Sequence, residues 1–360
     1  MRPLVVEALS IRSFRNLREA DVALGPRFNV VSGDNGQGKT SLLEALYVVL
    51  TSKSFRATKI EESITFGETS SLVRARILDG DLPRTQAVAL RRGGRDLRVD
   101  DKRPKSASDF ATLSPVVVFH PGELTLSSGS GSERRRLLDR VSLFASPSAA
   151  DELARYTRAV RSRQAALETR GPTSSDLAEW EALSARHGVR VVEARRRAIE
   201  GLAPATLATF AELMPGLDLA LDYVATAPSS EDDFAAQLRA NRPVDARRGS
   251  ASIGPHRDDL RLVLAGRPAR RTASHGQHRA LFLALKMAEL AAVGAITDAR
   301  PILLLDDVSS ELDRDRSSSL FALLSRGAGQ VLLTTTRPEI LETVGDRRDF
   351  RVAGGVVSRI

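Results

Sequence analysis

The sequence GDNGQGKT, from Gly33 to Thr40, constrains the fold of this chain more than any other feature. It matches the pattern G-x-x-x-x-G-K-[ST], in which glycines let backbone N–H groups turn inward around a β-phosphate. The lysine of this pattern reaches the β- and γ-phosphate oxygens, and the hydroxyl that follows it ligates magnesium. We therefore predict an ATP site with Mg²⁺ on Thr40, built by Gly33, Asp34, Asn35, Gly36, Gln37, Gly38, Lys39 and Thr40.

The residues on either side of this loop supply the context that the pattern requires. An apolar strand-like segment, FNVVSG, precedes it, and apolar residues recur at helical spacing from Leu42 to Leu50. The loop is therefore expected to join a buried strand to an amphipathic helix. The alternative, a glycine turn followed by an unrelated lysine, does not account for this order of elements.

Two carboxylates follow a second apolar segment, Ile302 to Leu305. A phosphate-loop protein needs one acid for the Mg²⁺ shell and one base to orient water. We assign Asp306 to the metal and Asp307 to the water, so that Lys39, Asp306 and Asp307 are the predicted catalytic residues. Transporter-type ATPases have glutamate at the second position. Asp307 is shorter by one methylene and should hold the water less well, which predicts slow hydrolysis. The alternative is a strand that merely ends in solvated acids.

A second candidate for phosphate recognition is the segment ASHGQHR, which contains Ser274, Gly276 and Gln277. A helix is expected to begin near His278, and a hydroxyl with a helix N-terminus suits an anion. We predict that these residues face the γ-phosphate of a nucleotide held by a second subunit. An ordinary N-cap is the alternative.

The pattern along the 360 residues indicates an α/β domain that is interrupted by helices. Antiparallel strands are expected between about 70 and 105, and helices between about 133 and 241. We predict a split ATPase head formed by residues 1–130 and 245–360, with a helical insertion at 131–244. The fold class is therefore α/β, with mixed sheets plus helices.

Composition excludes several classes of protein. The absence of cysteine excludes disulfides, thiolate zinc sites and cysteine catalysis. No apolar run approaches the length of a membrane helix, and the first residues alternate like a strand, so no membrane partner and a cytoplasmic, nucleoid-associated location are expected. A net charge of +8 favours polyanionic partners without naming one.

The three motifs, in this order, resemble the heads of ABC and SMC-like ATPases. By this resemblance Ser309 to Asp313 would form a loop across a dimer interface, and Thr334 to Thr336 would occupy a switch region, although no histidine is present there. Lys39 and Asp306 are separated by 267 positions (306 minus 39), which is too many for a compact transporter subunit and too few for a true SMC protein.

Local matches narrow the resemblance to the RecF family of bacterial recombination mediators. They are FRNL at 14–17, KSFR at 53–56, GSERRRLLD at 131–139, GPHRDDL at 254–260 and LLLDDVSSELDRDR at 303–316. The resemblance implies an ATP-dependent homodimer that binds gapped or junction DNA and helps RecO and RecR to load RecA, in repair and the SOS response. It also implies a weak, DNA-stimulated ATPase that acts as a switch. An energy-coupling transporter subunit is the alternative, and a metabolic kinase comes third.

Basic residues could contact DNA, although a solvated face explains each cluster equally well. The candidates are Lys53, Arg56, Arg92 and Arg95, with Arg91 and Arg98 beside them and a helical run of Arg155, Arg158, Arg161 and Arg163. Aromatic residues are 4% of the chain, so contact with the duplex backbone and strong salt dependence are expected. We assign no chemistry to the charged segment from His256 to Asp259, and we expect Tyr156 and Trp180 in the core of the insertion.

Overall fold

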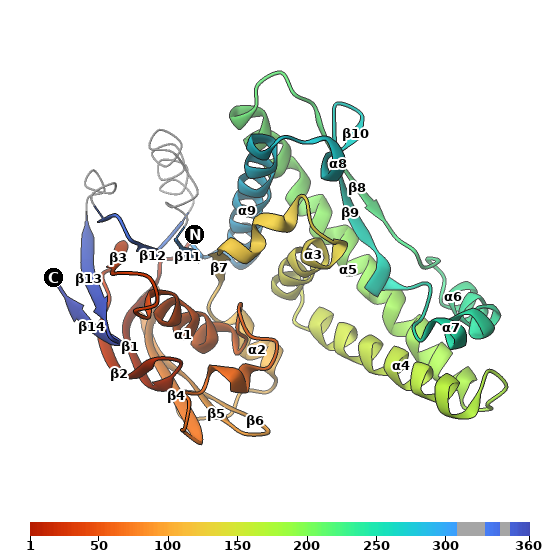
Figure 1. The fold of residues 1–360 in the computed structure, drawn as a ribbon, viewed down its shortest axis with the longest axis horizontal. Helices are drawn as coiled ribbons and strands as arrows, with labels where there is room; N and C mark the ends of the chain where they lie inside the picture. Colours follow the sequence, from red (N-terminus) through yellow and green to blue (C-terminus); the bar gives the residue numbers. More distant parts are fainter. Residues whose placement is uncertain (308–327, 339–345) are drawn as a thin grey trace. The chain divides into compact units, whose positions relative to one another are not determined.

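The computed structural model describes residues 1–307, 328–338 and 346–360 (Figure 1). Its contacts divide the chain into two compact units. The first unit is formed by Met1–Glu123 and Val293–Ile360, and the second by Leu124–Ala292. The first unit is therefore discontinuous in sequence, as expected for a head that is interrupted by an insertion.

An antiparallel sheet of five strands forms one layer of the first unit, in the order β2-β1-β4-β5-β6. Burial alternates along β4, so one face of this sheet is buried and the other is solvated. The strands predicted between about 70 and 105 are confirmed. The bounds are β1 Leu4–Phe14, β2 Leu17–Ala23, β4 Ser70–Asp79, β5 Leu82–Arg91 and β6 Gly94–Val99.

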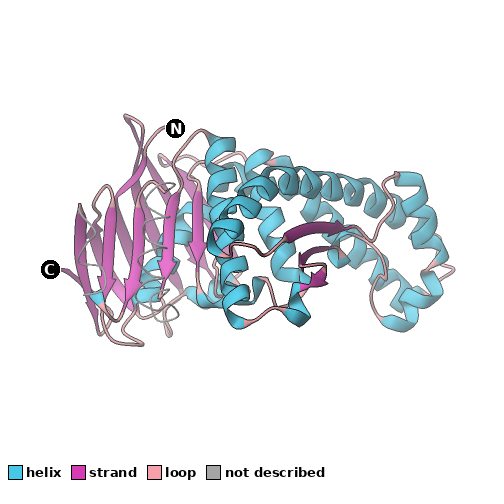
Figure 2. Cartoon of the chain, turned by 90° about the horizontal axis from the view of Figure 1, so that it is seen from above, coloured by secondary structure: helices cyan, strands magenta, loops and turns pink. Residues whose placement is uncertain are grey.

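A second sheet in this unit has six strands in the order β14-β13-β3-β12-β11-β7. The strands of this unit are drawn in magenta in Figure 2. Five of them are parallel, and β14 is the antiparallel edge. Strands β7, β11 and β12 are buried at every position, as in a parallel sheet covered on both faces. The bounds are β3 Phe28–Ser32, β7 Val116–Phe119, β11 Ile302–Asp306, β12 Val331–Thr335, β13 Arg347–Ala353 and β14 Val356–Arg359.

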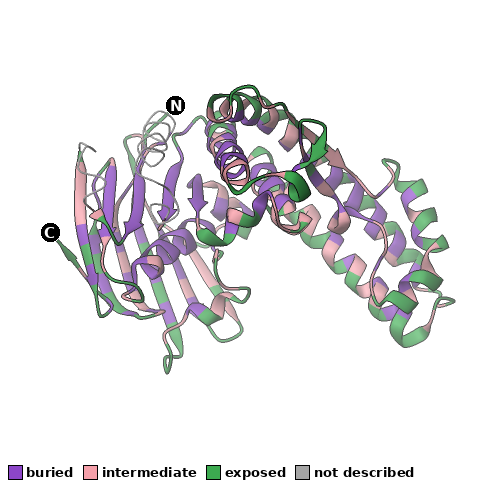
Figure 3. Cartoon of the chain, turned by 45° about the horizontal axis from the view of Figure 1, so that its top comes forward, coloured by how far each residue is buried: buried purple, intermediate pink, exposed green. Residues whose placement is uncertain are grey.

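Helix α1, Lys39–Thr51, contacts strands of both sheets and forms the centre of the first unit. Twelve of its thirteen residues are buried. Figure 3 colours the chain by burial, with buried residues in purple. The prediction of an amphipathic helix is therefore wrong, because sheets on two sides leave no solvated face. Two short helices, α2 Ala107–Thr112 and a 3₁₀ turn Ile60–Ser63, complete this part of the core.

A buried glutamine ties the two sheets of this unit together. The side chain of Gln330, just before β12, accepts a hydrogen bond from Val6 N at 2.8 Å and donates to Val6 O at 2.8 Å. It also donates to Gly25 O at 2.7 Å. The amide thus replaces a backbone partner for β1, which satisfies buried polar groups between the layers.

The second unit is mainly helical, with a small antiparallel sheet in the order β10-β9-β8. Residues 177–213 form one long helix with Pro204 inside it. The strand β8 was not expected at all. The helices are α3 Gly131–Ala145, α4 Ser148–Arg170, α5 Leu177–Leu213, α6 Glu231–Ala240, α7 Arg242–Arg248, α8 Ala269–Thr272 and α9 His275–Thr297; the strands are β8 Leu219–Val224, β9 Asp259–Leu264 and β10 Arg267–Pro268.

The end of the helical unit differs from the predicted boundary. The unit extends from 124 to 292, whereas the sequence indicated 131–244. The physical reason is pairing across the predicted boundary, because β8 pairs with β9 along its whole length. Arg134 of α3 also holds Asp259 of β9 at 2.7 Å. Residues 245–292 therefore belong with the helices by contact.

Helix α9 begins in the second unit and ends in the first. It is long and apolar enough to cross a membrane by length and composition alone. However, 67% of its apolar window is buried inside the protein, which is typical of a core helix.

Buried ion pairs cross the interior of the helical unit. Arg163 is 1% exposed and contacts Asp245 at 2.8 Å and Glu181 at 3.2 Å. Arg195 is 3% exposed, and its guanidinium contacts Asp139 at 2.7 Å. The suggestion that Arg163 lines a DNA-binding surface is therefore wrong, because its guanidinium is buried and paired with carboxylates inside the protein.

The charged segment before β9 is part of this interior. Asp258 is fully buried and accepts hydrogen bonds from the Tyr223 hydroxyl at 2.6 Å and from Thr226 N at 2.8 Å. The Tyr156 hydroxyl bonds with His256 Nδ1 at 2.6 Å. Tyr156 lies in the core, as predicted, and Trp180 packs partly buried against a second apolar cluster. These charged residues thus order the fold.

Candidate phosphate-binding site

The loop between β3 and α1 needs glycine at the positions where its backbone turns. Gly33, Gly36 and Gly38 have φ values of 149°, 79° and 121°, which disfavour other residues. A side chain at Gly33 would also place Cβ 2.3 Å from the carbonyl oxygen of Val352. The sequence pattern is thus required by the close approach of β13 and by the turn itself.

Lys39 points back into this loop. Its ammonium donates to Gly33 O at 2.6 Å and to Asp34 O at 2.9 Å, and the residue is 7% exposed. The positive charge is therefore held inside the ring of backbone that would surround a phosphate. Gln37 plays a different part, because its side chain accepts from Gly354 N at 2.6 Å and fixes the loop to the β13–β14 turn.

The two predicted metal ligands lie together. Thr40 Oγ1 donates to Asp306 Oδ1 at 2.7 Å, although 266 positions separate them in sequence. Strand β12 lies between β3 and β11, and its Thr334 hydroxyl also donates to Asp306 Oδ1, at 2.9 Å. Because parallel strands end at one edge of a sheet, these groups meet there. Thr334 therefore positions Asp306, a role that the sequence pattern does not indicate.

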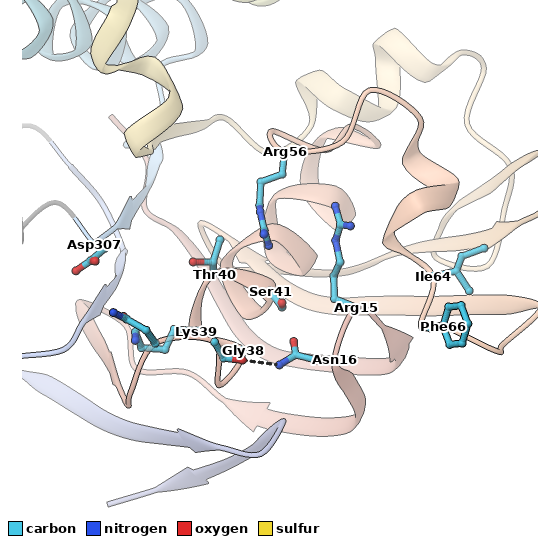
Figure 4. A pocket seen from close by; sticks show the side chains of 12 residues that line it. Arg15, Asn16, Gly38, Lys39, Thr40, Ser41, Arg56, Ile64, Phe66 and Asp307 are labelled. Atoms are coloured by element: carbon cyan, nitrogen blue, oxygen red, sulfur yellow. Dashed lines mark hydrogen bonds between the residues drawn. The ribbon is translucent and has the colours of Figure 1, made fainter.

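Asp307 follows directly in a left-handed conformation, with φ of 48°. Its backbone N–H donates to Thr334 Oγ1 at 2.9 Å, which fixes the turn after β11. Its side chain lines the same pocket as Lys39 and Thr40 (Figure 4). Asp307 thus shares a pocket with Lys39 and Thr40, and its predicted role in orienting water stays a prediction.

The donor set at this edge fits Mg²⁺. The ion prefers hard oxygen ligands and usually binds through one or two protein groups plus substrate phosphates. Thr40 and Asp306 supply such oxygens, already in contact with each other. Among the described residues no group of three or more acidic or histidine side chains could hold a metal by itself. The metal would therefore depend on phosphate oxygens.

A pocket of about 540 Å³ opens at this site. Figure 4 shows Arg15, Asn16, Arg56, Ile64 and Phe66 around it, together with the loop residues. Sequence reasoning assigned none of these five to the nucleotide site, although FRNL contains Arg15 and Asn16 and KSFR contains Arg56. The only sequence signal was that both motifs lie within about 25 residues of the loop. The sequence pattern suggests DNA contact for Arg56, whereas the structure places it in this pocket.

Ser274, Gly276 and Gln277 lie in the second unit, at the start of α9. The helix begins at His275, three residues before the predicted start. Gln277 N donates to Ser274 Oγ at 3.3 Å, and Ser274 N donates to Gln277 Oε1 at 2.8 Å. This reciprocal pair is a capping box, which corresponds to the N-cap alternative. Ser274 is exposed, so its predicted contact with a second subunit stays a prediction.

The candidate DNA-contacting residues are exposed with few exceptions. Lys53, Arg92 and Arg95 are exposed in the first unit, and Arg98 pairs with Asp96 at 3.0 Å. In the second unit the exposed members of the predicted run are Arg155, Arg158 and Arg161. The predicted interface loop, Ser309 to Asp313, lies outside the described residues.

Comparison with known proteins covers nearly the whole chain. Residues 5–353 match the family model "RecF/RecN/SMC N terminal domain". The chain is 37% identical to a "DNA replication and repair protein RecF" from Anaeromyxobacter sp. (strain Fw109-5), over 98% of each chain. It is 36% identical to a protein of the same description from Geobacter sulfurreducens (strain ATCC 51573 / DSM 12127 / PCA), covering 99% of this chain and 100% of the relative.

Solved structures agree with this likeness. A structure of "the recombination mediator protein RecF-ATP in RecFOR pathway" has a TM-score of 0.90 and 26% identity, and the match covers 99% of this chain and 98% of that one. An Smc head bound to the C-terminal winged-helix domain of ScpA has a TM-score of 0.54 at 16% identity, over 99% and 96% of the two chains. The second match supports the fold alone.

Proposed function

The chain belongs to the RecF family of DNA replication and repair proteins, and from this premise we propose that it is an ATP-dependent, DNA-binding recombination mediator. The observation that carries the proposal is the contact of Thr40 with Asp306 at 2.7 Å, beside a lysine held within a glycine loop. This arrangement suits the phosphates of a nucleotide. A solved RecF relative is described as bound to ATP, which supports ATP as the ligand.

Different residues of the first unit bind different parts of Mg²⁺–ATP. Lys39 exchanges its two backbone carbonyl contacts for phosphate oxygens, which costs little because a charged partner replaces neutral ones. Thr40 and Asp306 would hold Mg²⁺, which when bound neutralises charge on the phosphates. Asp307 orients the attacking water. Its short side chain favours slow hydrolysis, so that ATP acts more as a switch than as a fuel.

The second unit contributes through another copy of the chain. Ser274 is exposed at the N-terminus of a long helix, where a hydroxyl and the helix dipole favour an anion. We propose that Ser274, with Gly276 and Gln277, completes the γ-phosphate shell of a partner subunit. ATP binding then drives dimerisation, and hydrolysis releases the dimer.

DNA and protein partners follow from the family. The solved RecF relatives are placed in the RecFOR pathway, and we propose that this chain acts with RecO and RecR to load RecA. Its DNA target would be gapped or junction DNA, bound through phosphates. Exposed arginines on the β5–β6 hairpin, Arg92 and Arg95, and Lys53 remain the candidates for that contact. Affinity for DNA should therefore fall steeply as salt rises.

Sedimentation velocity of the whole chain, with and without ATP–Mg²⁺ and a gapped duplex, tests the proposal. The wild type should shift from monomer to dimer only with ATP. Lys39→Met and Ser274→Arg should each remain monomeric, whereas Lys105→Met, at an exposed site outside the pocket, should behave as wild type. A Lys39→Met protein that still dimerises with ATP would contradict the assigned site.

A further inference from the structure

A buried arginine near the start of α3 belongs to the motif GSERRRLLD, which has no part in the proposed function so far. Arg134 is 3% exposed, and its Nε and Nη2 donate to the two carboxylate oxygens of Asp259 at 2.7 and 3.0 Å. Asp259 begins β9 and belongs to a second motif of this kind, GPHRDDL. A bidentate pair fixes the geometry of both groups. Arg134 therefore joins the two motifs.

The remaining nitrogen of the Arg134 guanidinium holds the turn that precedes α3. Nη1 donates to Leu126 O at 2.9 Å and to Gly129 O at 3.3 Å. Buried backbone carbonyls at the end of a turn need hydrogen-bond donors, and the guanidinium supplies them here. The conformation of residues 126–129 therefore depends on Arg134.

Ser127 lies within this turn and contacts the first turn of α9. The residue is buried, and its hydroxyl lies 2.9 Å from His278 Nδ1 and donates to His278 O at 3.3 Å. These two contacts fix both the ring of His278 and its place along the helix. Because a serine side chain is short, a shift of the 126–129 turn would break both of them.

His278 in turn holds the backbone of Ser274. The His278 N–H donates to Ser274 O at 2.9 Å, in the first turn of α9. The capping box of Ser274 with Gln277 closes the same turn. A continuous series of contacts thus leads from Arg134 through the 126–129 turn to Ser274, and all of these residues belong to the second unit.

A second connection runs from Asp259 to Ser274 along the chain. Asp259 begins β9, and the short helix α8 packs against β9 and β10. Ala269 of α8 is fully buried, and its carbonyl oxygen accepts from Ala273 N at 2.9 Å, directly before Ser274. Ser274 is therefore held by α8 on one side and by the first turn of α9 on the other.

We propose that Arg134 is a positioning residue, which holds the start of α9 so that Ser274 reaches the γ-phosphate of a nucleotide bound to a second copy of the chain. This inference rests on the role of Ser274 in the proposed function. A group that binds a phosphate has to be held to within about 0.5 Å of its productive position. Ser274 is exposed, so its position depends on the buried residues that hold its turn.

The alternative is that Arg134 merely stabilises the helical unit, as Arg163 does. Arg163 pairs with Asp245 of α7 and Glu181 of α5, whereas the contacts of Arg134 lie on the two segments that lead to Ser274. A structural role would affect every property that needs a folded second unit. A positioning role affects only the nucleotide site to which the same chain contributes Ser274.

Two measurements on Arg134→Ala separate nucleotide binding from dimer formation. The Kd for a fluorescent ATP analogue with Mg²⁺, at protein concentrations too low for dimers, should stay unchanged because Arg134 does not line the nucleotide pocket. The dissociation constant of the ATP-bound dimer should rise about tenfold or more in sedimentation velocity. Arg136→Ala, exposed on the same helix, is the matched control and should leave both constants unchanged. An unchanged dimer for Arg134→Ala would overturn the inference.

Mixtures of variants give a readout that a merely structural role would not produce. In a mixture of Arg134→Ala and Lys39→Met, one site combines an intact Lys39 from the first chain with a correctly held Ser274 from the second. The dimer should therefore return with ATP–Mg²⁺. A mixture of Arg134→Ala and Ser274→Arg contains no such site and should stay monomeric. Failure of both mixtures would show a folding defect, and recovery in both would place the defect elsewhere; either result would overturn the inference.

Ser127→Ala keeps the inference testable if Arg134→Ala does not fold. It removes only the hydroxyl that contacts His278, and it should give the same pattern in the two mixtures. In hydrogen exchange followed by mass spectrometry, peptides that cover residues 274–282 should exchange about tenfold faster in Ser127→Ala, whereas peptides of α4 should not change. Unchanged protection of residues 274–282 would contradict the series of contacts and overturn the inference.

The outcomes separate this inference from the proposed function. A wild type that does not dimerise with ATP, or a Lys39→Met protein that does, would overturn the proposed function and the inference with it. Normal dimers of Arg134→Ala and Ser127→Ala, together with monomeric Lys39→Met and Ser274→Arg, would overturn the inference alone and leave the composite ATP site standing.

Discussion

The two units of this chain bury charge in different ways. In the first unit, the buried groups Lys39, Glu44 and Asp306 line the nucleotide pocket or hold the residues that line it. The rest of α1 packs in an apolar core. In the second unit, Arg163 and Arg195 are buried against carboxylates of other helices. These three buried groups of the first unit therefore serve the nucleotide pocket, whereas Arg163 and Arg195 of the second unit serve the architecture.

This difference has a physical basis. A central helix covered by two sheets can bury a long apolar surface, so polar groups are needed only where strands end. Short helices packed around a long one bury less apolar area than two sheets around a helix do. Each helix that ends inside the protein also leaves backbone N–H or C=O groups that need hydrogen-bond partners. Arg163 illustrates this, since it donates to Leu238 O at the end of α6 while pairing with Asp245. Bidentate guanidinium groups meet both demands at once.

The largest effect is expected from breaking the helical unit's ion pairs. Arg163→Ala leaves Asp245 and part of Glu181 uncompensated in the interior, which should cost about 3–5 kcal/mol of unfolding free energy. Arg161→Ala, at an exposed site on the same helix, should cost less than about 0.5 kcal/mol. Urea unfolding followed by circular dichroism measures both. A loss below about 1 kcal/mol for Arg163→Ala would remove the architectural role.

The apolar core of the first unit should respond to a cavity instead. Leu46 is fully buried in α1, and Leu46→Ala should cost about 2–4 kcal/mol through lost burial and an unfilled cavity. Unlike Arg163→Ala, its cost should not change with ionic strength, since no charge is exposed. Urea unfolding at low and high salt makes the comparison. Equal salt dependence of the two variants would contradict the view that buried charge stabilises the second unit and apolar burial stabilises the first.

A smaller effect is expected at the metal ligands. Thr334→Val keeps the shape of the side chain but removes the hydroxyl that donates to Asp306 and accepts from Asp307 N. ATP affinity in the presence of Mg²⁺ should fall about tenfold, the usual scale for a residue that orients a metal ligand. Thr336→Val, at an exposed position directly after β12, serves as the control. Titration with and without Mg²⁺ checks the result, and an equal loss in both conditions would speak against a metal-linked role.

The smallest effect is a pH dependence in the helical unit. Burial lowers the pKa of His256 below its usual value; the neighbouring Arg257 and Arg135 act in the same direction, while Ala251 O and Asp258 oppose them. The unfolded chain then binds the proton more readily, so stability should be fully present above about pH 6.5 and decline as the pH falls below it. His256→Gln should flatten that part of the profile. An unchanged slope would show that other groups cause it.

Local patterns made the nucleotide site predictable. A glycine loop between an apolar strand and a helix, and an apolar strand ending in two acids, are short-range signals, and the shared edge of a parallel sheet brings them together. The contact of Thr40 with Asp306 follows from that rule alone. The antiparallel strands between 70 and 105 were likewise visible from their alternation.

Other features depend on partners that are distant in sequence. The sequence around Arg163 indicates a surface residue, whereas in the structure its guanidinium pairs with Asp245, 82 positions later in the chain. Strand β8 was missed because its short, half-exposed segment is stabilised by β9 rather than by its own pattern. Arg15 and Arg56 came to the pocket through Glu44, whose role no spacing rule indicates. The boundary at 292 was missed for the same reason.

A mixing experiment tests most directly whether the nucleotide site needs two copies of the chain. In a mixture of Lys39→Met and Ser274→Arg proteins, one composite site of the mixed dimer would contain both an intact Lys39 and an intact Ser274. Each variant alone should stay monomeric with ATP–Mg²⁺ in sedimentation velocity, whereas the mixture should regain a dimer with one ATP for two chains. A mixture that stays monomeric while the wild type dimerises would contradict the account.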